Sequence, residues 1–108
     1  MLHAQLENMV KGWFVGNFEP SIYKTEAVEV GIKQYKAGDK EVWHFHKVAT
    51  EITVIVQGAV RMCGQEFRTN DIVVIPPGEG TAFEALEDSI TAVVKLPGAV
   101  NDKYVMDE

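Results

Sequence analysis

Alternating apolar and polar residues run through most of the chain after about residue 26. From Val28 to Lys33 hydrophobic side chains occupy every second position, which is the pattern of a strand with one buried face. Further strands are predicted at 42–47, 51–57, 59–63, 71–75, 81–85 and 89–96, with glycine or proline at nearly every joint. Short strands in close succession, without long helical patterns between them, predict an all-β barrel or sandwich.

The two ends of the chain follow other patterns. Apolar residues at helical spacing near the N-terminus predict either a short amphipathic helix or an irregular segment that covers one end of the barrel; they are Leu6, Met9, Val10 and Trp13. The tail at 97–108 either frays or packs on the barrel. We therefore expect one domain with a covering segment at 1–25, a barrel at 26–96 and a tail at 97–108.

Composition narrows the class of protein. A length of 108 residues fits one domain, and 46% hydrophobic residues exclude a disordered chain. The net charge of -6 without a basic cluster argues against nucleic acid as a partner, and no apolar run approaches the roughly 20 residues of a membrane span. The N-terminus lacks a signal-peptide pattern, and a single cysteine, Cys63, excludes an internal disulfide. We expect a cytoplasmic protein.

Candidate chemistry begins with two histidines. His44 and His46 stand two apart on a predicted strand, so their imidazoles point to the same face. Glu51 follows a bend and can return its carboxylate to the same place. Two imidazoles and a carboxylate suit iron, manganese, nickel or zinc, and three protein ligands leave positions open for water or substrate.

The spacing around these residues resembles the first motif of the cupin superfamily. That motif is glycine, five residues, His-x-His, four residues, glutamate, six residues, glycine. The chain matches it at every fixed position: Gly38, His44, His46, Glu51 and Gly58. The resemblance implies a single-domain cupin barrel, also called a double-stranded β-helix or jelly roll, that holds one divalent metal ion on His44, His46 and Glu51.

The second cupin motif is incomplete. Pro76 and Gly78 match it, and Asn70 stands in place of its glycine, a mild change because asparagine tolerates left-handed backbone. Thr81 occupies the position of the family's fourth ligand, a histidine, and Ala85 replaces the asparagine. We expect Thr81 and Phe83 to line the pocket, with Thr81 near the ion but too short to bind it.

Two functions follow from the resemblance. The first is a metal-dependent enzyme acting on a small polar metabolite, by oxygenase or by isomerase or epimerase chemistry. The alternative is a non-catalytic cupin that binds a metal or a sugar-like ligand, since sequences near both ends (12–14 and 102–104) resemble small cupins of surface-polysaccharide pathways. Fold alone does not decide between them.

The small core predicts a homodimer. Trp43 and Phe45 alternate with the histidines, so they face the other side of their strand. They serve either internal packing or a subunit interface, where aromatic residues are enriched. Lys33 and Tyr35 share one face of an earlier strand. That face either lines the pocket or is the solvated outer face, and we expect the outer one.

Overall fold

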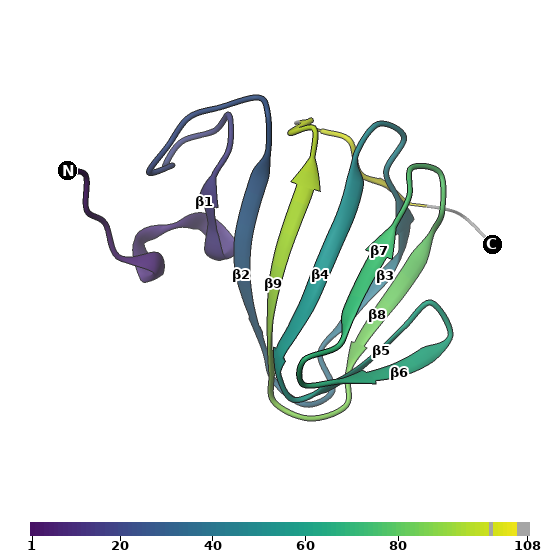
Figure 1. Ribbon diagram of the computed structural model, residues 1–108. Coiled ribbons are helices and arrows are strands. Elements are labelled where there is room, and N and C mark those ends of the chain that lie inside the picture. The colour runs from purple at the N-terminus through teal and green to yellow at the C-terminus, as the bar shows by residue number, and fades with distance from the viewer. Residues whose placement is uncertain (100, 106–108) are drawn as a thin grey trace.

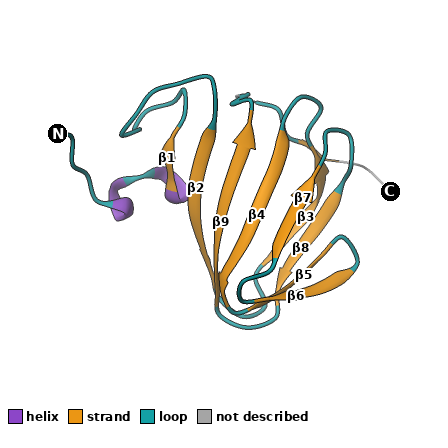
Figure 2. Ribbon diagram, in the orientation of Figure 1, coloured by secondary structure: helices purple, strands orange, loops and turns teal. Residues whose placement is uncertain are grey.

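Two antiparallel five-stranded sheets form the protein in a computed structural model that describes residues 1–99 and 101–105 (Figures 1 and 2). One sheet has the order β1-β2-β9-β4-β7 and the other the order β10-β3-β8-β5-β6. The predicted all-β barrel is confirmed. The strands are β1 (Trp13–Val15), β2 (Glu29–Tyr35), β3 (Lys40–Phe45), β4 (Thr50–Gln57), β5 (Ala59–Met62), β6 (Gln65–Arg68), β7 (Ile72–Ile75), β8 (Thr81–Ala85), β9 (Ser89–Leu96) and β10 (Tyr104–Val105).

The apolar core fills one end of the space between the sheets. It consists of buried side chains from β4, β5, β7 and β8, namely Ile55, Val60, Met62, Ile75, Phe83 and Ala85. Ile55 lies near the C-terminal end of β4, whereas Glu51 lies near the start of the same strand. The core also reaches the candidate site, because Ile75 pairs with Glu51 and Phe83 lines the same cavity.

Of the two alternatives for the N-terminal segment, the amphipathic helix through Trp13 does not form. Two short 3-10 helices, η1 (Leu6–Asn8) and η2 (Val10–Gly12), lead directly into β1, which adds to the free edge of β2 (Figure 1). Gly12 has a positive φ of 83°, and a Cβ there would lie 1.8 Å from the carbonyl oxygen of Ile32. Only glycine allows this close approach of the segment to β2.

The inward face of β2 is not its apolar face. Lys33 and Tyr35 line the internal cavity, and the Tyr35 ring centroid lies 4.4 Å from that of Phe83. The expectation that these two residues face solvent is therefore wrong. Val30 and Ile32 point to the other side of the sheet, where the N-terminal segment approaches Ile32. The described residues contain no helix long and apolar enough to cross a membrane.

Candidate metal centre

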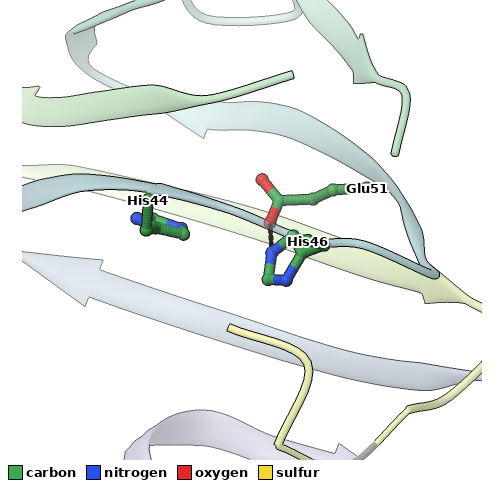
Figure 3. A group of neighbouring side chains, drawn as sticks. All are labelled: His44, His46 and Glu51. Atoms are coloured by element: carbon green, nitrogen blue, oxygen red, sulfur yellow. Dashed lines mark hydrogen bonds and ion pairs between the residues drawn. The ribbon is translucent and has the colours of Figure 1, made fainter. Parts of the chain in front are cut away.

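Three candidate ligands converge where β3 passes into β4. His44 is on β3, His46 follows the end of that strand, and Glu51 is near the start of β4. Their ligand atoms lie within 4.8 Å of one another, and Figure 3 shows the Glu51 carboxylate reaching the ring of His46 with His44 beside them. The predicted strand at 42–47 ends at Phe45, yet both imidazoles still line the same cavity.

Each imidazole is oriented through its Nδ1 atom. His44 Nδ1 lies 3.0 Å from the carbonyl oxygen of Val42, and His46 Nδ1 lies 2.6 Å from that of Asp102. A carbonyl only accepts a hydrogen bond, so both rings carry a proton on Nδ1 and donate it. When His46 gives up the second proton, which its Nε2 shares with Glu51, both Nε2 atoms offer a lone pair to an ion, which is the usual arrangement of metal-binding histidines.

The pair His46 and Glu51 has the spacing of two ligands on one ion. His46 Nε2 lies 3.3 Å from Glu51 Oε1, and two ligands bound at about 2.0–2.1 Å in tetrahedral geometry stand roughly that far apart. The hydrogen bond to Glu51 raises the pKa of His46 against the opposing effect of burial. A bound ion takes the place of the proton that this bond shares, so the donor set fits a divalent metal.

Glu51 is held as a carboxylate inside the barrel. Burial alone would raise its pKa, but the hydrogen bond and charge of His46, the Thr53 hydroxyl and the charge of Lys95 together lower it. Thr53 Oγ1 donates to Glu51 Oε2 over 3.1 Å. The carboxylate therefore keeps its negative charge and has one oxygen facing His46.

The C-terminal tail fixes the loop between the ligands. The Asp102 carboxylate accepts hydrogen bonds from the backbone N–H groups of Lys47, Val48 and Ala49 at 2.9–3.0 Å. Burial would raise the pKa of Asp102, but these three donors lower it. The backbone carbonyl oxygen of Asp102 accepts the hydrogen bond from His46 Nδ1. One residue therefore orients both the loop and a candidate ligand.

The incomplete second motif lies beside this loop. The N–H of Gly78 donates to the carbonyl oxygen of His46 over 2.7 Å, and Gly78 and Asn70 both have positive φ, 86° and 77°. Thr81 is the cross-strand partner of His44, and its hydroxyl accepts from the N–H of Cys63 at 2.7 Å and donates to the carbonyl of Ala82. The Thr81 hydroxyl therefore makes its hydrogen bonds with backbone groups.

The candidate ligands open into a cavity of about 230 Å3. Thr81 and Phe83 line it. So do charged and polar residues that we did not assign to a site from the sequence: Lys11, Lys33, Tyr35, Glu41, Lys95 and Lys103. The sequence did contain one indication of this lining: the polar residues Glu29, Lys33 and Tyr35 lie on the same face of β2. Reading that face as the inner one requires knowing that the apolar face of this sheet points outward.

No protein-family model matches the sequence, and no curated protein is similar to it. Solved structures are similar in fold. A protein with a double-stranded β-helix domain from Klebsiella pneumoniae aligns with a TM-score of 0.68 and 18% identity over 78% of each chain. KdgF from a Halomonas species gives a TM-score of 0.65 and 24% identity, over 71% of this chain and 74% of its own.

A third neighbour has "cupin-2 domain" in its description and comes from Shewanella frigidimarina, with a TM-score of 0.58 and 18% identity over 69% of this chain and 76% of that one. The chain has the cupin fold. The resemblance inferred from Gly38, the His-x-His pair, Glu51 and Gly58 is confirmed at this level. Another structure of similar fold is that of oxalate decarboxylase from Bacillus subtilis, a protein with Mn(II) centres, which aligns with a TM-score of 0.63 and 21% identity over 76% of this chain and 25% of its own.

Proposed function

We propose that this cupin is a metal-dependent enzyme that acts on a small polar metabolite by proton transfer, the chemistry of isomerases and epimerases. The observation that carries the proposal is that an open set of three candidate ligands shares one cavity with two side chains able to exchange protons, Tyr35 and Lys33. Oxygenase chemistry needs the open ligand set alone, so the presence of proton donors favours the first class.

His44, His46 and Glu51 would hold the ion, which is iron, manganese, nickel or zinc by the donor set. A bound divalent metal supplies Lewis acidity, which polarises a substrate oxygen and acidifies the neighbouring carbon. Thr53 and Asp102 keep Glu51 and His46 in place through the hydrogen bonds described above. Thr81 and Phe83 bound the space next to the ligands and exclude water from it.

Tyr35 and Lys33 have complementary proton affinities. Burial raises the pKa of the Tyr35 phenol well above its ordinary range, and the charges of Glu41 and Glu51 raise it further. Burial lowers the pKa of Lys33, although Glu41 opposes this effect. The phenol oxygen of Tyr35 therefore retains its proton and can donate it to a developing oxyanion, while Lys33 Nζ gives up a proton more readily than a surface lysine.

Metal content and solvent exchange together test this function. Protein reloaded in turn with iron, manganese, nickel and zinc should retain about one ion per chain after dialysis. In D2O the loaded protein should exchange a carbon-bound proton of at least one member of a panel of hydroxy acids, keto acids and aldoses, measured by NMR. Tyr35→Phe should abolish exchange, and Tyr23→Phe, an exposed site, should not.

Two results would contradict the proposal. Retention of no metal by the wild type would remove the centre itself. Metal retention without exchange in any substrate, with binding of a sugar or acid left intact, would favour the non-catalytic alternative.

We also propose that the protein is a homodimer, joined through the outer face of the sheet β2-β9-β4-β7. Trp43 and Phe45 have internal partners instead: Trp43 lies against Gly80 and Phe45 stacks on Tyr104. The outer sheet face carries two apolar rows that cross four strands in register; these rows are Val30, Val94, Ile52, Val74 and Ile32, Ala92, Val54, Ile72. Ile72 and Val74 are 66% and 57% exposed.

A second copy of the chain fits this face because the rows are uncharged in a chain of net charge -6 and a face of this kind is self-complementary about a two-fold axis. Light scattering should give twice the 12.0 kDa chain mass. Ile72→Lys should shift the mass toward one chain, and Val48→Lys, at an exposed site in the loop before β4, should leave it unchanged. A monomeric wild type would contradict the proposal.

A further inference from the structure

One wall of the cavity is formed by four lysines that are far apart in the sequence. Lys11 comes from η2, Lys33 from β2, Lys95 from β9 and Lys103 from the tail just before β10. The chain has only ten basic residues and a net charge of -6. Nearly half of its basic residues therefore meet at one cavity of an acidic protein. We refer to these four residues as the lysine cluster.

The charge of the lysine cluster is only partly balanced. Among the described residues that line the cavity, the carboxylates are Glu41 and Glu51, which leaves two positive charges in excess. Lys95 Nζ lies 4.0 Å from Glu29, at the limit of an ion pair. Across 1–99 and 101–105, the other three lysines have no carboxylate within that distance; Lys33 Nζ instead donates to the carbonyl oxygen of Lys11 over 2.8 Å.

Trp13 holds two of these ammonium groups in place. Lys33 Nζ and Lys95 Nζ lie 5.3 Å and 4.8 Å from the centroid of its ring, within the range of cation–π attraction. The ring itself lies against Gly31, where an added Cβ would come within 2.8 Å of it. Two lysine side chains, which are mobile on an open surface, are therefore directed to one region before any ligand arrives.

We propose that the lysine cluster binds an anionic oxygen group, a carboxylate or a phosphate, of the same small molecule whose other end lies at His44, His46 and Glu51. This inference rests on the proposed function and adds the substrate class to it. A cavity of about 230 Å3 suits a small organic anion.

The electrostatics of the wall support an anion in particular. Burial lowers the pKa of Lys33, and the charges of the other members of the cluster lower it further, with Glu41 opposing. Like charges held together at a partly buried site cost free energy, which a bound anion recovers. A neutral sugar would leave this repulsion in place.

Isothermal titration of protein treated with EDTA tests the cluster without the metal. The probes are malonate, inorganic phosphate and the uncharged malonamide. We expect one of the two anions to bind and malonamide not to bind. The variant Lys33→Met/Lys95→Met keeps both aliphatic stems and removes both charges, and it should weaken anion binding at least tenfold. Lys36→Met, on an exposed turn, makes the same change outside the cavity and should have no effect.

The two anions distinguish the sources of the anionic group, because tighter binding of malonate assigns a carboxylate and tighter binding of phosphate assigns a phosphate. If the double variant fails to fold by circular dichroism, Lys103→Met in the irregular tail carries the test, with an expected loss of threefold or more. Binding of neither anion, or equal affinity in the lysine variants, would overturn the inference. Zinc retention by the same samples reports separately on the metal centre, so either proposal can fail alone.

Discussion

The two regions that resemble the cupin motifs, 38–58 and 70–85, differ in what they contribute to the candidate site. In the first, His44, His46 and Glu51 bring their ligand atoms within 4.8 Å of one another. In the second, Asn70 and Gly78 keep the left-handed turns, but Thr81 directs its hydroxyl to backbone groups of Cys63 and Ala82. The first region supplies the candidate ligands, and the second supplies backbone shape and cavity-lining side chains but no candidate ligand.

This difference shows that the structural and chemical roles of a motif are separable. The second region still serves the first, because the N–H of Gly78 binds the carbonyl oxygen of His46 at 2.7 Å. It supports the loop of the candidate ligands without contributing a ligand of its own. Substitutions in the two regions should therefore differ in kind: metal affinity should respond in the first and folding stability in the second.

The largest effect is expected from His46→Ala. The change removes a candidate ligand and leaves two, which rarely hold an ion against water, so zinc affinity should fall by more than about 100-fold. Competition with a chromophoric chelator measures it. His3→Ala, at the exposed N-terminus, is the matched control and should bind as the wild type does. Unchanged affinity in His46→Ala would place the metal elsewhere.

Thr81→His should give the second region a metal ligand of its own. Thr81 is the cross-strand partner of His44 and lines the cavity, so an imidazole there can reach the same ion. Zinc should bind about tenfold more tightly or better, since metal binding is worth many kcal/mol shared among the ligands. The metal-free variant should lose about 1–3 kcal/mol, because the Cys63 N–H loses its acceptor. Equal or weaker zinc binding would show that position 81 does not replace the fourth ligand in space.

Asp102→Asn tests the support of the first region. In the wild type, three backbone N–H groups donate to the Asp102 carboxylate. In the variant, the side-chain amide replaces one accepting oxygen by an N–H group that faces these donors. Unfolding free energy should fall by about 1–3 kcal/mol. Zinc affinity should fall by about tenfold, because the loop after His46 is held less firmly although the backbone carbonyl that orients His46 is kept. Asp71→Asn, whose carboxylate accepts the Arg68 N–H in a turn away from the site, should lose stability without losing zinc affinity. An equal zinc affinity in both variants would contradict this role.

The sign of the pH dependence follows from the same residue. The fold lowers the pKa of Asp102 below its ordinary value of 3.8. Its contribution to stability is therefore present above that value and is lost as the pH falls through the lower, folded pKa. Asp102→Asn should remove this part of the acid dependence, which urea unfolding at several pH values will show.

The smallest effect is expected at Asn70, where only the backbone matters. Asn70→Gly restores the family's residue at a φ of 77° and should change stability by less than about 0.5 kcal/mol. Asn70→Ala places a poorly suited residue in that conformation and should cost about 1–2 kcal/mol. Neither change should alter zinc affinity. A change in metal binding here would mean that the second region contributes more than shape.

The fold and the meeting of the ligands were predictable from local patterns. Period-two alternation and turn residues identified strands, and the spacing from Gly38 to Gly58 placed two histidines and a glutamate in one motif. The i, i+2 argument predicted the right outcome for His44 and His46 even though β3 ends at Phe45, since both imidazoles line the same cavity. These features depend on residues that are close in sequence.

The rest depends on contacts between distant segments. The inward turn of Lys33 and Tyr35 could not be deduced, because β2 carries its apolar residues on the face away from the cavity. Helical spacing up to Trp13 was misleading, since Gly12 permits a sharp approach to β2 and pairing with Gly31 then decides the conformation. The lysine cluster brings residues 11 and 33 together with residues 95 and 103, and the contact of Asp102 with 47–49 also spans more than 50 positions.

The hydrogen bonds of Asp102 have a consequence for how the protein is made. His46 and the loop after it emerge from the ribosome early, but the groups that orient them lie more than fifty residues later in the chain. Translation therefore delivers the ligands well before their support. A nascent chain that has not yet extruded the segment around 102 carries the histidines without the groups that orient them, so a metal held by these residues would be acquired only after that segment is in place.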